Sequence, residues 1–425
     1  MPKNIVLCLD GTGNSIHNNR SSVLRLFSLI DKAEPQKGKD AQVCYYDTGI
    51  GTVGHVSSWF SWPKEKIDKI RQGLGAGMEQ NVIDAYGFLC RHYEDGDRIM
   101  IYGFSRGAFT ACVLAAFVHN MGLLRPHDLH LAVNCLAAYK LMTSKDIDDG
   151  DRESRFRPIR YYERALRPPH RPPIHFLGLF DTVNSVIVPV GKASFDLSSI
   201  NLANAKSNPS VLRVRQALAI DERRRNYRPV LWDQSKHAYL RRFPRKDDQG
   251  EFLPTDVTEQ DVEQVWFAGY HSDVGGSSTF ENLPADKRDD NAYAKVALEW
   301  MIDHSPKELR FLDHWVTRKV RGEQTEQDKT DGRTWKYAKP DPVGLTLSSM
   351  TPVWKALEWF PIRKRKWTYP KPNREIAGFV WPTFEPRFIP TDHTVHESVF
   401  MRRDQKSYAP ENLEDYLSRR PDINS

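Results

Sequence analysis

Residues 98–108 read Arg-Ile-Met-Ile-Tyr-Gly-Phe-Ser-Arg-Gly-Ala, and this segment is the most informative part of the chain about its fold. Its first half is a continuous apolar run, which is typical of a strand covered on both faces, as in a parallel sheet. Its second half fits the pattern Gly-x-Ser-x-Gly, with Ser105 between Gly103 and Gly107. In that pattern the serine lies on a sharp turn between a strand and a helix, where side chains two positions away would clash. The stretch therefore predicts a strand, a turn that presents Ser105, and a helix.

Similar strand–loop–helix units occur along the rest of the chain. Short apolar runs at 5–9 and 42–46 predict two strands, and helices are expected from Ser21 or Ser22 to Ile30 and over 65–93. Further strands are expected at 174–180 and 265–268, each followed by polar residues. Repeated units of this kind predict an α/β fold with a mostly parallel central sheet and helices on both faces. In such sheets, ligands bind at the carboxyl ends of the strands.

Composition restricts the class of protein. The 425 residues include 61 Lys+Arg and 55 Asp+Glu, for a net charge of +6, and 40% are hydrophobic. This supports a packed core, and the mild positive charge gives no reason to expect nucleic acid as a partner. We find no signal peptide and no apolar stretch near the roughly 20 residues of a membrane-spanning helix, so we expect a protein made in the cytoplasm. Five scattered cysteines predict neither a disulfide framework nor a zinc site, and we expect no metal and no cofactor.

The order of these segments predicts the domain organisation. An α/β-hydrolase core is expected over 1–276 and 389–403, with internal excursions at about 125–172 and 184–260. Residues 277–388 are rich in Pro, Trp and Lys/Arg and are too long for a plain connection, so they are expected to form an insertion or cap. Residues 404–425 are polar and are expected to lie on the surface.

Ser105 is the candidate nucleophile of a hydrolase. A serine nucleophile needs a histidine base and an acid that orients it, and α/β-hydrolases carry them in the order serine, acid, histidine. His396, near the chain end, is the expected base. Asp273 and Asp181 each follow a predicted strand, and Asp273 is favoured as the acid because Val-Gly-Gly follows it and allows close backbone approach. The other aspartate is expected to support the site by hydrogen bonding, and a glycine-rich turn without catalysis is the structural alternative.

An oxyanion hole needs two backbone N–H donors. Arg106, which follows the serine, is expected to supply one, and the loop around Gly11 and Thr12 the other. The segment Asp10-Gly-Thr-Gly also resembles a phosphatase box, but Cys8 occupies the position of the nucleophilic aspartate. Phosphoryl transfer is therefore a poor fit.

Two basic-aromatic segments allow two interpretations. Trp beside Lys/Arg suits contact with an anionic bilayer, and the alternative is a cap whose aromatic residues pack on the core beside a solvated basic edge. The segments comprise Trp354, Trp359, Phe360 and Trp367 around 363–366, and Trp59, Phe60 and Trp62 before Lys64, Lys66 and Lys69.

Taken together, the motifs resemble a known family. The sequence from 4 to about 403 is similar to the α/β-hydrolase domain of the type VI secretion phospholipase effectors and their relatives of unknown function. This resemblance implies a Ser–Asp–His triad, matched here by Ser105, Asp273 and His396, and hydrolysis of phospholipid acyl esters. The motifs are Leu9-Asp-Gly-Thr-Gly-Asn14, Tyr46-Asp-Thr-Gly-Ile-Gly-Thr52, Gly103-Phe-Ser-Arg-Gly-Ala108, Phe180-Asp-Thr-Val183, Ala217-Leu-Ala-Ile-Asp-Glu-Arg223, Trp266-Phe-Ala-Gly-Tyr-His-Ser-Asp-Val-Gly-Gly276 and Val395-His-Glu-Ser-Val399.

The resemblance has departures that keep alternatives open. Gln216 stands where the family often has histidine, and Ser277 stands where it often has a third glycine. The expected function is a serine esterase or lipase acting on phospholipid acyl esters. The alternatives are an esterase acting on a small soluble ester or a polyester, and a catalytically silent scaffold that binds a lipid surface or a protein. Export by a type VI secretion system, with a secretion or immunity protein as partner, is a further expectation that the resemblance carries.

Overall fold

The structure is a computed structural model of the chain. It describes residues 2–11, 21–33, 41–49, 64–142, 152–183, 187–190, 194–197, 202, 204–233, 238–240, 249, 257–277, 292–334, 337–344, 346–359, 362–363, 375–376, 379–381 and 384–423.

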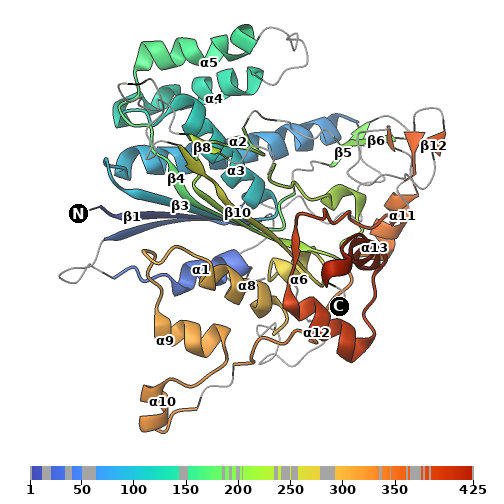
Figure 1. Cartoon of the computed structure of the whole chain (residues 1–425). Coiled ribbons are helices and arrows are strands. Elements are labelled where there is room, and N and C mark those ends of the chain that lie inside the picture. Colours follow the sequence, from blue (N-terminus) through green and yellow to red (C-terminus); the bar gives the residue numbers. More distant parts are fainter. Residues whose placement is uncertain are drawn as a thin grey trace.

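A seven-stranded sheet, parallel throughout, forms the centre of the described fold (Figure 1). Its spatial order is β14-β10-β7-β4-β3-β1-β2. This confirms the α/β-hydrolase class with a mostly parallel sheet that the sequence predicts. The strands are β1 (Asn4–Leu9), β2 (Gln42–Asp47), β3 (Arg98–Phe104), β4 (Ile174–Phe180), β7 (Arg213–Ala219), β10 (Asp261–Phe267) and β14 (Thr394–Val395).

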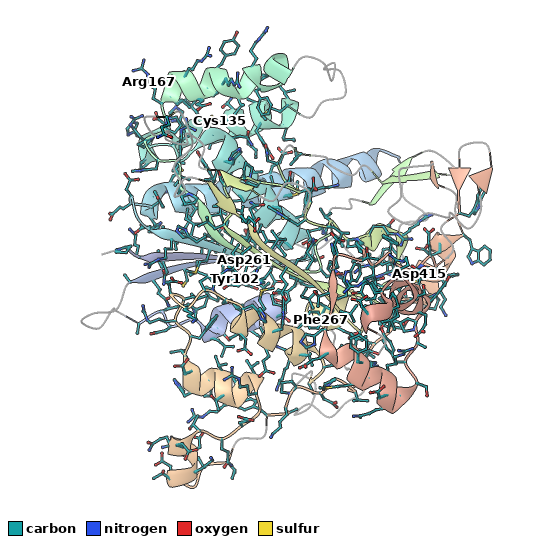
Figure 2. All side chains as sticks on the ribbon, in the orientation of Figure 1. Tyr102, Cys135, Arg167, Asp261, Phe267 and Asp415 are labelled. Carbon is teal, nitrogen blue, oxygen red and sulfur yellow. The ribbon has the colours of Figure 1, made fainter. Side chains whose placement is uncertain are left out.

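Helices cover both faces of this sheet, which explains why its strands read as continuous apolar runs. On β1, Ile5 and Leu7 pack with α2 and α3 on one face, while Val6 and Cys8 pack with α1 and α8 on the other. Tyr102 and Phe267 join the second layer (Figure 2). The helices, including short 3-10 and π turns, are α1 (Ser22–Leu29), α2 (Lys64–His92), α3 (Arg106–Met121), η2 (Pro126–Leu131), α4 (Ala132–Leu141), α5 (Arg152–Leu166), η3 (Arg225–Tyr227), α6 (His271–Val274), α8 (Ala294–Asp303), α9 (Asp313–Trp315), η4 (Val316–Val320), α10 (Glu326–Thr330), α11 (Pro352–Glu358), α12 (Glu397–Lys406), α13 (Glu411–Arg419) and η5 (Pro421–Ile423).

Local sequence signals placed the first helix well. The Ser21 side chain accepts a hydrogen bond from the Leu24 N–H at 3.0 Å, so Ser21 caps α1 as expected. None of the helices that the structure describes is both long and apolar enough to cross a membrane.

The core reaches into segments that were expected to lie outside it. Strand β7 lies within the 184–260 excursion, and α8, from the 277–388 segment, buries Trp300 and Met301 against the sheet. In α13, Leu413 and Tyr416 have no exposed surface, so residues 411–419 are not the surface tail that the sequence predicts. The remaining described strands form small sheets outside the central one. They are β5 (Ile187–Val190) with β6 (Ser194–Leu197), β8 (Ala238–Leu240) with β9 (Val257–Glu259), and β11 (Ile362–Arg363) and β12 (Glu375–Ile376) on either side of β13 (Phe379–Val380).

The register of the central strands positions the site. Phe104, the last residue of β3, pairs with Phe180, the last residue of β4, and Phe180 pairs with Ala217 of β7. The residues that follow these strands therefore meet at one edge of the sheet, as the topology rule for open α/β sheets requires.

Candidate active site

Ser105 lies on the turn between β3 and α3. Its backbone has φ 58° and ψ −124°, a conformation that non-glycine residues rarely adopt. A Cβ on Gly103 would lie 2.5 Å from the Cα of Ala108, and a Cβ on Gly107 would lie 2.2 Å from the carbonyl oxygen of Leu9. The two glycines are therefore required by close packing around the turn, for the reason that the sequence pattern suggests.

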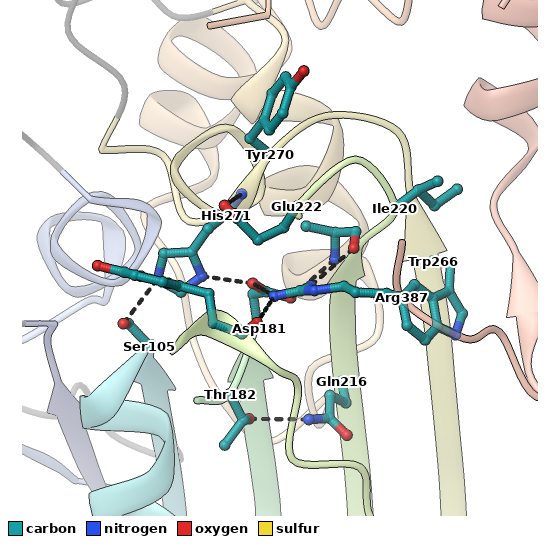
Figure 3. Close-up of polar contacts among 12 residues, drawn as sticks. Ser105, Asp181, Thr182, Gln216, Ile220, Glu222, Trp266, Tyr270, His271 and Arg387 are labelled. Carbon is teal, nitrogen blue, oxygen red and sulfur yellow. Dashed lines mark hydrogen bonds and ion pairs between the residues drawn. The ribbon is translucent and has the colours of Figure 1, made fainter. Parts of the chain in front are cut away.

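His271 faces Ser105 from the start of α6. Its Nε2 lies 2.8 Å from the Ser105 Oγ (Figure 3). The ring is buried between Phe104, at a centroid distance of 4.8 Å, and the edge of Tyr227, also at 4.8 Å. Gly269, with φ +95°, makes the turn that returns the chain from β10 to this position.

Asp181 lies on the opposite side of the imidazole. Its Oδ2 is 2.5 Å from the His271 Nδ1, and its Oδ1 accepts a hydrogen bond from the Ala219 N–H at 3.0 Å. Asp181 has no exposed surface and a φ of 41°. With an ionised Asp181, Nδ1 is assigned as the donor to the carboxylate, which leaves Nε2 to accept the proton of the Ser105 hydroxyl. The three side chains form one hydrogen-bonded line.

Two arginines compensate the buried carboxylates near His271. Arg387 binds both oxygens of Asp181, at 2.6 and 2.9 Å. Arg224 binds both oxygens of Glu222, at 2.9 and 2.8 Å, and one of these oxygens also accepts the backbone N–H of His271 at 3.3 Å. The cluster therefore contains two negative and two positive side chains around a histidine.

The pKa values follow from burial and these partners. Burial alone would raise the pKa of Asp181, but the Arg387 guanidinium and the hydrogen bond from His271 hold that pKa well below its usual range. Burial likewise opposes ionisation of Glu222, and Arg224 outweighs it, so the pKa of Glu222 falls to about 2. Burial lowers the pKa of His271, and the contact with Asp181 opposes that shift. A buried carboxylate that stays ionised beside a neutral histidine is the resting state that general-base chemistry needs.

Asp273, the favoured acid, has a different place. Its Oδ2 accepts the Tyr270 N–H at 2.9 Å in a capping box, and its Oδ1 accepts the Leu347 N–H at 3.4 Å. This corrects the expected contact with a histidine base: Asp273 caps the helix that begins with His271, and Asp181 holds the imidazole. The hydrogen bonds described for Asp273 therefore serve its own helix turn and the Leu347 N–H.

His396, the expected base, does not face Ser105. It is the N-cap of α12, where its Nδ1 accepts the Ser398 N–H at 3.2 Å and its ring stacks on Phe267 at 4.5 Å. The structure therefore corrects the pairing of His396 with Ser105, because the sheet brings the loop after β10 to the serine. The sequence-based choice of base passes over His271, although this residue lies within one of the quoted motifs. The usable signal was its position just past a parallel strand, like Ser105 and Asp181.

The structure treats the three expected oxyanion donors, Gly11, Thr12 and Arg106, differently. The Gly11 N–H donates to the carboxylate of Asp10 at 2.6 Å, so the structure directs it away from the expected role. Thr12 lies outside the described residues. Arg106 is the first residue of α3, and its N–H belongs to the first turn, where no intrahelical acceptor exists. Among the described residues, no group of three or more His, Cys, Asp or Glu side chains could hold a metal ion.

The basic-aromatic segments are described only in part. Trp354 packs edge-on against Tyr227 at 5.7 Å and lies beneath the Arg224 guanidinium at 5.3 Å, so this aromatic residue supports the site. Trp359 is 65% exposed. The side chains of the remaining members lie outside the described residues, namely Trp59, Phe60, Trp62, Lys64, Lys66, Lys69, Phe360, residues 363–366 and Trp367.

The chain is similar in sequence or in structure to several known proteins. The chain is 29% identical over 235 residues to the uncharacterized protein YEL023C of Saccharomyces cerevisiae, a match that covers 54% of this chain and 32% of that protein. An uncharacterized protein from Pseudomonas aeruginosa aligns with a TM-score of 0.36 at 17% identity, covering 78% of this chain and 49% of that one. The Tle1 effector bound to the VgrG spike of the type VI secretion system aligns with a TM-score of 0.31 at 18% identity, covering 66% and 52%.

The chain thus spans about a third to a half of the length of these relatives. The family itself is shown by sequence, because residues 3–304 match the family described as "T6SS, Phospholipase effector Tle1-like, catalytic domain". This match covers most of the chain and includes Ser105, Asp181 and His271. The chain therefore belongs to the family of type VI secretion Tle1-like phospholipase effectors, in the region of their catalytic domain.

Proposed function

We propose that this chain is a serine hydrolase that cleaves carboxylic esters, with phospholipid acyl esters as its substrate class. The observation that carries the proposal is the line Ser105 Oγ, His271 Nε2, His271 Nδ1 and Asp181 Oδ2, with separations of 2.8 Å and 2.5 Å between the residues. Membership of a phospholipase effector family supports the lipid substrate. The catalytic roles proposed here replace the earlier assignment of Asp273 and His396.

The geometry supports an acyl-enzyme route. As Ser105 Oγ bonds to the ester carbonyl carbon, its proton passes to the Nε2 of His271. The ester C–O bond then breaks, and the imidazolium returns that proton to the leaving alcohol. In the second half, water gives a proton to the same nitrogen and attacks the acyl-enzyme. The proton then returns to the Ser105 Oγ as the fatty acid leaves.

Two features stabilise the charges that form on this route. Asp181 keeps its negative charge beside the Nδ1 of His271 and so stabilises the imidazolium. The carbonyl oxygen becomes negative at the start of α3, where the Arg106 N–H and the positive end of the helix dipole are available. We assign the first oxyanion donor to this N–H.

The test is covalent labelling followed by substrate assays. Intact-mass spectrometry after fluorophosphonate treatment should show one adduct, and Ser105→Ala should remove it. Ser210→Ala is the matched control, because Ser210 also pairs with a histidine, His119, at 2.6 Å but is remote from the candidate site. Adducts that persist in Ser105→Ala, or none in the folded wild type, would overturn the proposed nucleophile.

Substrate class is tested separately, on enzyme that has not been treated with the phosphonate. Fatty-acid release from phospholipid vesicles should exceed release from short soluble esters at equal ester concentration, and it should disappear in Ser105→Ala. If Ser105 takes the phosphonate but the untreated enzyme cleaves only soluble esters, the proposed mechanism stands and the phospholipid assignment is wrong.

A further inference from the structure

Arg387 is buried behind the acid of the candidate site (Figure 3). Its side chain is 1% exposed and makes four hydrogen bonds. Nη1 donates to Asp181 Oδ1 at 2.6 Å and to the Ala219 carbonyl at 2.8 Å. Nη2 donates to Asp181 Oδ2 at 2.9 Å and to the Tyr227 carbonyl at 2.5 Å. Both oxygens of the carboxylate are thus held by one planar group that is itself anchored on two other segments.

We propose that Arg387 is a positioning residue of the active site, which fixes the Asp181 carboxylate toward His271 and keeps the imidazole neutral before reaction. This inference rests on the proposed function. It assigns a role to a residue outside the family match, which ends at residue 304.

The contacts of the Asp181 carboxylate explain how Arg387 positions it. Apart from Arg387, the bonds described for the Asp181 carboxylate are those to the Ala219 N–H and to His271. Those two contacts engage one oxygen each. The guanidinium fork adds a second contact to each oxygen, and its bidentate geometry fixes the plane of the carboxylate. A lysine could supply the charge but not this fork.

Charged and titratable groups from several elements surround His271 and its acid. Asp181 follows β4, Glu222 and Arg224 lie after β7, Tyr227 belongs to η3, and Arg387 lies behind Asp181. The four charged members sum to zero. Loss of the Arg387 charge would leave the cluster negative, and a negative cluster favours the imidazolium form of His271.

The segment that carries Arg387 is hydrogen-bonded to the loop that follows β7. Arg228 donates to Glu385 at 3.0 Å and to the Pro386 carbonyl at 3.1 Å. The C-terminal segment and the loop after β7 therefore join beside the site. It follows that Asp181 is fully positioned only when residues 385–387 are docked.

The experiment compares Arg387→Met with Arg387→Lys. Arg318→Met is the matched control, because Arg318 makes a similar buried two-point contact with Asp328, at 2.7 and 2.5 Å, but in the η4–α10 region away from the site. The readouts are the pH dependence of kcat/KM on an ester and the direct titration of His271 by NMR of 13C-labelled histidine, assigned with His271→Gln.

We expect Arg387→Met to raise the pKa of His271 by about one unit and to move the acid limb of kcat/KM upward equally. Its kcat should fall about 100-fold, because a small misplacement of a catalytic group has effects of that size. Arg387→Lys should leave the limb in place and lower kcat by about 10-fold. The control should change neither limb nor kcat.

A folded Arg387→Met variant would overturn the charge role if its acid limb of kcat/KM and its His271 titration both match those of the wild type. Wild-type kcat in Arg387→Lys would overturn the positioning role, and this variant decides the matter if the methionine variant does not fold. Failure of the proposed function is distinguishable, since a wild type that neither hydrolyses esters nor takes the phosphonate still permits the His271 titration.

Discussion

The histidine that serves Ser105 can be identified with two single substitutions. In His271→Ala, the serine loses the nitrogen at 2.8 Å that would accept its proton. In His396→Ala, α12 loses its cap to Ser398 and the ring stacked on Phe267, while the line through Ser105 is untouched. The two changes therefore separate catalysis from local stability.

The two substitutions should have very different effects on kcat. Removing the base of a triad lowers kcat by about 10⁴- to 10⁶-fold, because the members act as a unit. For His396→Ala, the lost cap costs about 1 kcal/mol and the lost stacking about 1 kcal/mol. A total of about 2 kcal/mol leaves a protein with a typical stability of roughly 5–15 kcal/mol folded, so activity at 25 °C should stay near that of the wild type.

The assay measures fatty-acid or chromogenic-ester release by both variants, with urea unfolding to record the free energy of unfolding. We expect His271→Ala to be folded but inactive, and His396→Ala to be active with a lower unfolding midpoint. The opposite pattern, an inactive folded His396→Ala and an active His271→Ala, would show that His396 serves Ser105, as the sequence predicts.

Three further outcomes test the surroundings of the site. Gly107→Ala should destabilise the fold by about 3 kcal/mol, because the added Cβ would lie 2.2 Å from the Leu9 carbonyl oxygen. Gly87→Ala in α2 is the control and should be neutral or stabilising. Urea unfolding of both variants measures the difference. Arg224 lowers the pKa of Glu222 to about 2, so the stabilising contribution of Glu222 is present above about pH 4.5 and is lost as the pH falls toward 2. In Glu222→Gln, the free energy of unfolding should therefore depend less on pH in the acid range. Leu413→Ala should cost about 2–5 kcal/mol in thermal or urea unfolding if α13 belongs to the core, and a cost near zero would contradict that.

The sequence predicts local structure well where one segment carries the whole signal. Residues 98–108 contain both the apolar run and the glycines around Ser105, so they indicate the strand, the turn and the helix together. By contrast, Arg213–Ala219 has charged or polar residues at positions 213, 215 and 216, yet it forms a buried central strand. Its Arg215 is satisfied by Asp261 of the neighbouring strand, a compensation that the local pattern does not contain.

The amino-acid sequence is enough to predict the α/β class, the family and the position of Ser105, because apolar runs, short motifs and glycine spacing are local properties of the chain. Tertiary structure alone decided which histidine and which aspartate approach that serine. The register of β3, β4, β7 and β10 brings Asp181 and His271 to one sheet edge, while Asp273 turns to cap its own helix. The contact of Arg387 with Asp181 spans 206 positions of sequence. No local pattern encodes such a contact, because it forms only when the strands and the C-terminal segment have packed.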